Sequence, residues 1–379
     1  MAVLAACSQP TAHPLPSPSA SPRVAIATPT APLPACLDAP ALPPAPAGVR
    51  STVPAWVLAS GLDQPDDLWF RDGVTYVGQL VGGHVATIRP GRPVDQSAYV
   101  VPIAEGIAFL GDRMFVADQQ DDRVDEIVGG QARTFLQLQP VTGKDNVDGI
   151  GVQGDQLLVP DSPNGNLLWV DGSGRITRTV GGFNRPTGAW PLPDGSVLVA
   201  DEYGNAALEV APNGAKTFLV RGLPIVDDVA ADAAGRVFVV TPVVTGGRVA
   251  ELVGGSAQDL AGNLLEPQGL GFDSAGNVLV SETAAGRLDV FIRTFKLVPF
   301  GGRPAPGQPV CLTVFRSPGF TGDVQLTAGS GVEIVRQPGT GDVGEVLIQP
   351  SAGCAKVGCA VTATSGGLAD TTWITWITG

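Results

Sequence analysis

From residue 51 onward, apolar residues occur in short runs that repeat as a unit. Each unit has an anchor rich in Pro, Gly and acids, a short apolar strand, a Gly-containing turn and a second apolar strand. The second strands cover 75–77, 114–118, 157–161, 197–201, 237–240 and 278–282. A third run follows in several units, and a fourth is visible at 134–136 and 217–219. Six units of about 40 residues with four strands each predict a six-bladed β-propeller over 51–295.

Closure of this ring depends on the two ends of the repeat region. The last unit lacks an obvious fourth strand, whereas an apolar run at 53–58 precedes the first unit. We expect this run to complete the last blade, because joining the ends leaves no long unpaired strand edge.

Residues 296–379 break the repeat. Their apolar residues alternate at period two in six or seven short runs separated by Gly and Pro turns. This pattern predicts a small immunoglobulin-like β-sandwich. No catalytic motif occurs in it, so we expect a spacer or adhesion module. The predicted fold class is therefore all-β, and the 50 Gly and 34 Pro residues agree, because both residue types break helices.

The N-terminal segment has a different composition. Residues 8–50 contain 12 of the 34 Pro residues among Ser, Thr and Ala, which is typical of a semi-extended linker. The run Leu4-Ala5-Ala6-Cys7 resembles the lipobox at which bacterial lipoproteins are lipidated on Cys. Residues 1–7 are thus predicted to be a lipoprotein signal with a truncated start, since only six residues precede Cys7. The alternative is a plain disordered N-terminus.

This interpretation predicts an extracytoplasmic, membrane-anchored lipoprotein at the cell surface or in the periplasm. Such a compartment allows disulfides, and the four remaining cysteines form an even set with three possible pairings. We favour Cys311 with Cys359 across the sandwich, because each lies in a strand-like run. Cys36 with Cys354 would then tie the linker to the last domain.

Charge and histidine content exclude several functions. The net charge is −13, and residues 51–295 carry it with 30 acidic and 16 basic residues. A nucleic-acid partner is not expected, because phosphate binding needs a basic patch. Cations or neutral ligands fit better. Only one His, His84, falls in the repeat region, which disfavours Ser-His-Asp catalysis and multi-His zinc sites.

The candidate chemistry lies just before the innermost strands, where one residue of each unit is expected to face a mouth of the central channel. Four of these are carboxylates and two are neutral oxygen donors: Asp66, Glu105, Asp148, Thr187, Asp227 and Gln268. Confined carboxylates either take up protons or hold a cation. All-oxygen ligands favour Ca²⁺ first and Mg²⁺ next. We therefore predict a ligand site at these six positions, with Ca²⁺ or another divalent cation as its cofactor. The alternative is that the Asp residues only cap turns.

The repeat itself resembles a known group. Its pattern of Pro-x-Gly, then Gly-x-[Leu/Val/Phe]-x-Val-[Ala/Ser]-[Asp/Glu], then [Gly/Asn]-Arg-[Val/Leu] resembles NHL-type repeats over about 53–295. It is also similar to the calcium-dependent six-bladed propellers that include the senescence-marker-protein/gluconolactonase family. The resemblance implies metal ligands at Glu105, Asp148 and Asp227. It also implies a lactonase in which the metal polarises the ester carbonyl and Asp66 or Asp227 activates water.

Three departures qualify this resemblance. Asp148 stands where that family often has Asn, and Asp228 replaces a Gly. The Asn-Asp-Gly…Gly-Arg segment that helps to bind substrate has no counterpart. Virginiamycin-lyase-like propellers rely on active-site His, which this sequence does not supply.

Two functions follow from these observations. We expect a non-catalytic propeller whose acidic channel mouth binds a ligand, a cation or a partner at the cell envelope. The alternative is a divalent-metal-dependent lactonase or esterase. A third interpretation is an adhesion or scaffold protein whose sandwich contacts polysaccharide or peptidoglycan. The membrane is expected to be reached through the lipid anchor, and the protein is expected to be a monomer.

Overall fold

The computed structural model describes residues 41–298, 309–351 and 358–374. These residues form strands and turns, with one short 3-10 helix at Ser162–Asn164. In this part of the chain, no helix has the length and apolar character needed to span a membrane. The predicted signal with Cys7, most of the linker, and the cysteines Cys36 and Cys354 lie outside the described residues.

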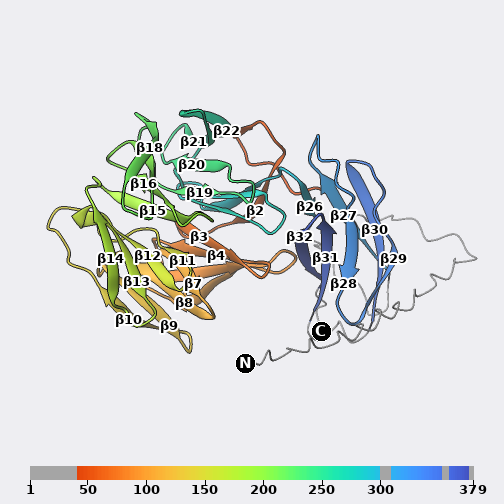
Figure 1. The fold of residues 1–379 in the computed structure, drawn as a ribbon. Coiled ribbons are helices and arrows are strands. Elements are labelled where there is room, and N and C mark those ends of the chain that lie inside the picture. Colours follow the sequence, from red (N-terminus) through yellow and green to blue (C-terminus); the bar gives the residue numbers. More distant parts are fainter. Residues whose placement is uncertain (1–40, 299–308, 352–357, 375–379) are drawn as a thin grey trace, which may run out of the picture. The chain divides into compact units, whose positions relative to one another are not determined.

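Six antiparallel blades follow one another along the chain (Figure 1). Each blade has four strands, and the innermost strand lies at the central channel. In blades 1 to 5 the four strands follow one another along the chain, whereas the outermost strand of blade 6, β2, comes from the N-terminal side. Blade 1 consists of β3 (Pro65–Arg71), β4 (Val74–Gln79), β5 (His84–Ile88) and β6 (Asp95–Val100). Blade 2 consists of β7 (Ala104–Leu110), β8 (Arg113–Asp118), β9 (Arg123–Val128) and β10 (Gln131–Gln137). Blade 3 consists of β11 (Gly151–Gln153), β12 (Gln156–Asp161), β13 (Asn166–Asp171) and β14 (Ile176–Gly181). Blade 4 consists of β15 (Pro186–Pro191), β16 (Val197–Asp201), β17 (Ala206–Val210) and β18 (Lys216–Arg221). Blade 5 consists of β19 (Val229–Ala231), β20 (Val237–Thr241), β21 (Gly247–Val253) and β22 (Ser256–Leu264). Blade 6 consists of β23 (Pro267–Phe272), β24 (Val278–Glu282), β25 (Arg287–Phe291) and β2 (Ala55–Ser60). The predicted all-β, six-bladed propeller is confirmed.

The ring closes through the pairing of its two ends. Strand β2 lies antiparallel to β25, with Ala55 opposite Phe291 and Ser60 opposite Arg287. The preceding β1 (Arg50–Ser51) pairs with β22 at the edge of blade 5. The run predicted to supply the missing strand of the last blade therefore does so.

The hydrophobic cores lie between neighbouring blades. One apolar cluster joins each adjacent pair: for example, Phe115 and Leu157 belong to the cluster shared by blades 2 and 3. The cluster between blades 6 and 1 contains Trp56 of β2, which is 4% exposed. Trp69 and Trp190 are partly buried and also pack against these clusters. Because the apolar faces are used between blades, the central channel is free to be polar.

Short Asp-based turns set the ends of several hairpins. The Asp232 carboxylate accepts hydrogen bonds from the backbone amides of Ala234 and Arg236. Asp273 makes the same pattern at the equivalent turn of blade 6, and Asp171 makes it at the β13–β14 turn of blade 3. A side-chain oxygen thus takes the donors that the turn leaves unpaired, which is the usual reason for Asp at such positions.

The C-terminal segment forms two packed sheets. One sheet contains β26 (Phe295–Leu297), β27 (Val310–Arg316), β30 (Val343–Pro350) and β29 (Val332–Arg336), and the other β28 (Gln325–Ala328), β31 (Cys359–Ser365) and β32 (Leu368–Ile374). Their inner faces share one apolar core. The predicted sandwich is present, whereas its immunoglobulin-like character stays a prediction.

The two described cysteines of the sandwich face different ways. Cys359 belongs to the core between the sheets. Cys311 alternates with Val310, Leu312 and Val314, which point into that core, so its side chain lies on the opposite face of β27. The favoured Cys311–Cys359 pairing stays a prediction. The other pairings involve residues outside the described ranges and stay a prediction.

A buried lysine ties three segments together. Lys296 of β26 is 2% exposed and binds Asp273 at 2.9 Å and Asp370 at 2.6 Å. Asp273 belongs to the β23–β24 turn of blade 6, and Asp370 to β32. Although burial opposes the charge, these two carboxylates raise the pKa of Lys296 above its usual range.

Ring closure by β2 makes a prediction about truncation. Deleting residues 1–60 removes β2 and Trp56, and we expect the free energy of unfolding to fall by at least about 3 kcal/mol, the usual cost of losing a buried Trp. Deleting residues 1–53 removes β1 but keeps β2 and serves as the control. Equilibrium denaturation of both truncated proteins tests the idea. Equal stability of the two would contradict a structural role for β2.

Candidate functional site

The side chains predicted to face the channel mouth are positioned by irregular inner strands. The pairing register shifts between Pro65 and Leu68 in β3, and at the equivalent points of β7, β15 and β23. Each shift spans the predicted position of its blade. Such bulges change the direction of side chains next to binding sites. The bulges in these four inner strands therefore direct the predicted side chains toward the mouth of the channel.

Five of the six predicted residues line one cavity of about 310 Å³. They are Asp66, Glu105, Asp148, Asp227 and Gln268. Thr187 differs, because its hydroxyl is buried and donates a hydrogen bond to the backbone carbonyl of Asp227. Thr187 therefore fixes the backbone next to the site and does not line the cavity.

Three carboxylates converge at the centre of this cavity. Asp66, Asp148 and Asp227 each offer an oxygen, and the three oxygens lie within 4.8 Å of one another. All three residues are buried, and they come from blades 1, 3 and 5. The resemblance implied Glu105 with Asp148 and Asp227; in the structure Asp66 completes this close group and Glu105 lines the same cavity beside it.

Two buried carboxylate oxygens at this site lack a hydrogen-bond partner among the described residues. They are Oδ1 of Asp66 and Oε2 of Glu105, on side chains 2% and 3% exposed. A buried carboxylate oxygen without a donor is costly. The arrangement therefore favours a bound cation or proton.

Among the described residues that line the cavity, Arg185 is the one cation. Arg185, just before β15, donates to Asp148 Oδ2 at 2.6 Å and also binds Glu202. Burial disfavours the charge of Arg185, but Asp148 and Glu202 outweigh this effect and raise its pKa above the usual range. Only one oxygen of Asp148 is used by Arg185. The other has no described hydrogen bond, so Asp148 can serve Arg185 and a second cation at once.

The rim of the cavity continues this network. Asp145 lies 3.8 Å from Nε of Arg185 and accepts a hydrogen bond of 2.7 Å from the Tyr203 hydroxyl. That hydrogen bond, with burial, raises the pKa of Tyr203 to about 12. The Arg185 guanidinium stands 5.5 Å from the centre of the Tyr203 ring. Arg185 is thus held on several sides, which restricts the orientation of Asp148.

The carboxyl groups respond electrostatically to their confinement. Burial, followed by repulsion from Asp148, raises the pKa of Asp66, Glu105 and Asp227 well above their usual values. Burial also raises the pKa of Glu202, against the opposing effect of Arg185. One arginine therefore does not neutralise the group. A second positive charge would stabilise the ionised forms.

Sequence reasoning did not identify Arg185, Glu202, Asp145 or Tyr203 as parts of the site. A signal for Arg185 was present in the repeat alignment. The equivalent positions of the other five units are Gln64, Ile103, Asn146, Ile225 and Glu266. Arg185 is thus the single base at a position next to a ring of acids, and an uncommon charge there indicates a partner.

A second group of acids at the ends of the second strands has structural roles. Asp118 and Glu282 pair with Arg123 and Arg287 at 2.8 and 2.5 Å within their own blades. Asp201 accepts hydrogen bonds from the backbone amides of Asn184 and Arg185. Turn capping and intrablade ion pairs thus account for these residues, and Asp201 also positions the backbone of Arg185.

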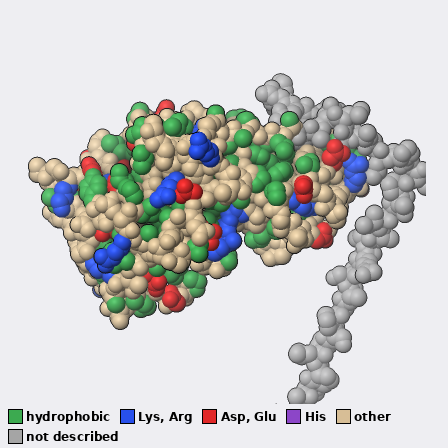
Figure 2. Space-filling view, turned by 90° about the horizontal axis from the view of Figure 1, so that it is seen from above, with side chains coloured by type: hydrophobic (Ala, Val, Ile, Leu, Met, Phe, Trp, Pro, Cys, Tyr) green, Lys and Arg blue, Asp and Glu red, His purple; other side chains and the backbone are tan. Residues whose placement is uncertain are grey.

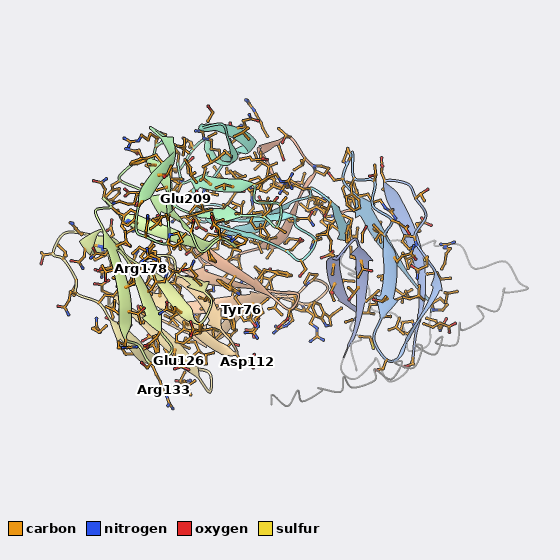
Figure 3. All side chains as sticks on the ribbon, viewed as in Figure 1. Tyr76, Asp112, Glu126, Arg133, Arg178 and Glu209 are labelled. Atoms are coloured by element: carbon orange, nitrogen blue, oxygen red, sulfur yellow. The ribbon has the colours of Figure 1, made fainter. Side chains whose placement is uncertain are left out.

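Several charged residues of the blades pair with neighbours of opposite sign. Glu126 of β9, labelled in Figure 3, binds Arg113 at 2.7 Å. Asp112, also labelled, binds Arg71 at 2.7 Å. On the face shown in Figure 2, Lys and Arg side chains form small separate groups. Exposed pairs of this kind contribute little free energy.

Comparison with known proteins supports the fold. No protein-family model and no curated protein sequence matches the chain. A gluconolactonase from Xanthomonas campestris is 16% identical, with a TM-score of 0.53, over 66% of this chain and 97% of its own. Regucalcin, a calcium-binding protein from Agrobacterium tumefaciens, is 13% identical, with a TM-score of 0.50, over 62% of this chain and 92% of its own. A luciferin-regenerating enzyme is 9% identical, with a TM-score of 0.52, over 63% of this chain and 94% of its own.

At these identities the likeness shows the fold alone. The protein is similar in fold to gluconolactonase-like and regucalcin-like β-propellers, as the sequence resemblance predicts. The site must therefore be interpreted from its own residues.

The role of Arg185 can be tested by stability. Arg185→Met leaves Asp148 and Glu202 without their cation, and we expect the free energy of unfolding to fall by about 3–5 kcal/mol at pH 7. The loss should shrink toward pH 5, where protonation relieves the repulsion. Arg175→Met, which removes an exposed partner of Asp171, should cost at most about 1 kcal/mol. Equal effects of the two substitutions would contradict the proposed role.

The raised pKa values predict how stability varies with pH. Burial raises the pKa of Asp228 from 3.8 to about 7, so between these values the folded protein binds more protons than the unfolded chain. The free energy of unfolding of metal-free protein should therefore fall as pH rises from about 4 to about 7. Asp228→Asn should reduce this slope. Denaturation at several pH values tests it, and an unchanged slope in the variant would show that Asp228 titrates normally.

Proposed function

We propose that the protein binds a divalent cation at the channel mouth and uses it to hold an oxygen-bearing ligand. The observation that carries this proposal is the convergence of three carboxylate oxygens, from Asp66, Asp148 and Asp227, within 4.8 Å. Hard cations with oxygen ligands prefer such groups, and Ca²⁺ accepts the irregular geometry that a ring of side chains provides. The unpartnered Oδ1 of Asp66 gives independent support.

The chain's own residues have distinct roles in this proposal. Asp66, Asp148 and Asp227 would hold the cation, and Arg185 would orient Asp148 through its hydrogen bond. Glu105 and Gln268 line the same cavity outside the three-oxygen group, so they are available to a ligand. The cavity volume of about 310 Å³ suits a small organic molecule.

A second candidate function is hydrolysis of a lactone or ester. It is favoured by the fold likeness to a gluconolactonase and by a spare buried carboxylate at the site. A divalent cation would supply a Lewis acid for the ester carbonyl. The sequence suggested Asp66 or Asp227 as the base, but both belong to the three-oxygen group, so Glu105 is the better candidate. Its carboxylate would take a proton from the attacking water as the ester C–O bond breaks.

The proposal also covers the cellular location of the protein and its attachment to a membrane. We place the protein outside the cytoplasm, attached to a membrane through Cys7, where it meets an envelope ligand or protein. The support is the lipobox-like run and the Pro-rich linker. Radiolabelled palmitate incorporation in a bacterial host, lost in Cys7→Ser, tests this attachment separately from the site.

Calcium titration tests the proposed function. Metal-free protein should bind one Ca²⁺ per chain by calorimetry, more tightly at pH 8 than at pH 5, because the ligands must be deprotonated. Asp227→Asn should lower the affinity at least about tenfold, which corresponds to about 1.4 kcal/mol. Asp145→Asn, at the rim of the same cavity, is the matched control and should change it much less.

The outcomes separate the two functions. No saturable binding, or equal affinity of both variants, would overturn the cation site. If calcium binds, the loaded protein is then assayed against a panel of lactones and esters. Turnover lost in Glu105→Gln with calcium affinity retained would establish hydrolysis. Calcium binding without turnover would support a binding protein.

A further inference from the structure

A second cavity of about 220 Å³ lies further along the innermost strands, beyond the acidic mouth. Its wall is mainly apolar and includes Trp69 of β3, Trp190 of β15, Ile107, Ile150 and Leu270. Two buried carboxyl groups also line it, Asp67 and Asp228. None of the mouth residues Asp66, Asp148 and Asp227 lines this cavity, so the two sites are separate.

A tight layer of backbone separates the two cavities. Each position directly after a mouth residue is either Gly or Asp: Asp67, Gly106, Gly149, Gly188, Asp228 and Gly269. A Cβ atom on Gly106 would lie 2.4 Å from the backbone nitrogen of Ile150, and one on Gly269 would lie 2.5 Å from the carbonyl oxygen of Asp66. Side chains are therefore excluded from most of this layer.

The two Asp residues occupy space that the glycines leave. A Cβ atom on Gly149 would lie 2.6 Å from Oδ2 of Asp67, and one on Gly188 would lie 2.3 Å from Oδ1 of Asp228. Two carboxyl groups thus fill the layer from blades 1 and 5 and border the apolar cavity. Asp228, which stands where the resembled family has Gly, therefore places a carboxyl group beside Gly188 and at the wall of the cavity.

The two carboxyl groups differ in their partners. Asp228 accepts hydrogen bonds from the backbone amides of Val229 and Leu270 at 2.7 and 3.0 Å. Asp67 is 8% exposed, and the structure shows no side-chain hydrogen bond for it among the described residues. Burial, followed by the charge of Asp228, raises the pKa of Asp67. A buried carboxyl group that borders a cavity without a donor favours a ligand that brings one.

We propose that this second cavity binds a small apolar organic amine, with its ammonium group at Asp67 and Asp228 and its hydrocarbon part between the apolar walls. The two tryptophans add apolar surface and aromatic faces that attract an organic ammonium. A cavity of about 150 Å³ holds benzene, so 220 Å³ suits one aromatic ring with a short aminoalkyl chain. A hydrated inorganic ion does not match an apolar wall.

The test uses 2-phenylethylammonium chloride and the full chain. Calorimetric titration should show saturable binding with one site per chain. The uncharged 2-phenylethanol, which has nearly the same size, should bind at least about tenfold more weakly, because it lacks the charge. Equal affinity for the two compounds would overturn the assignment of an ammonium site.

Substitutions locate the binding. Asp67→Asn and Asp228→Asn keep the side-chain shape and should each weaken amine binding at least about tenfold. Asp112→Asn removes one exposed carboxylate outside the channel and controls for the overall charge. Unchanged affinity in both Asp67→Asn and Asp228→Asn, or an equal loss in Asp112→Asn, would overturn the site.

Tryptophan fluorescence gives a readout that does not depend on folding of the Asp variants. Since Trp69 and Trp190 line the cavity, the amine should change the emission of the unaltered protein with the same midpoint as the calorimetric titration. Trp190→Phe should reduce that change. An unchanged emission at saturating amine, or an equal emission change in Trp190→Phe, would overturn the proposal.

Discussion

The repulsion among carboxylates in the channel mouth is the constraint on which the rest of the site depends. Six blades that bury their apolar faces against one another leave only the innermost strands to line the channel. Asp66, Asp148 and Asp227 are brought together by that geometry, and burial increases their mutual repulsion. The folded structure must compensate this charge, and the closed ring prevents the blades from moving apart to relieve it.

Arg185 provides part of the compensation and explains several neighbouring features. It is held by Asp148, Glu202 and Asp145, and its backbone amide is held by Asp201. A guanidinium group can satisfy several carboxylates because its donors spread in a plane. Asp66 and Glu105 still each have one oxygen without a hydrogen-bond partner in the described part of the chain. A divalent cation beside Arg185 would complete the compensation, and the same cation would attract an oxygen ligand into the mouth.

The sequence predicted the fold well because repeats and strand patterns depend on local residues. The ring of acids was predictable because its residues occupy the same position in each repeat unit. Strand β2 completes the last blade, as expected from the missing strand. Asp66, Glu105, Asp148, Asp227 and Gln268 do share one cavity. Each of these features is set by the position of a residue within its own unit.

Features that depend on contacts between units could not be predicted. Thr187 occupies a ring position, but its hydroxyl bonds to the backbone of the next blade. The side chain of Arg185 reaches Asp148 in the preceding blade, a contact that the repeat spacing does not show. The cavity at Asp67 and Asp228 arises from close packing of glycines in four blades, which no single unit reveals.

The central claim is that the channel mouth holds a divalent cation next to Arg185. The most direct test is anomalous diffraction from crystals grown with MnCl₂, since Mn²⁺ also prefers oxygen ligands and scatters anomalously. The account predicts one strong peak within about 2.6 Å of carboxylate oxygens from Asp66, Asp148 and Asp227, with Arg185 still bound to Asp148. Peaks confined to the protein surface, with the mouth filled only by water and Arg185, would contradict it.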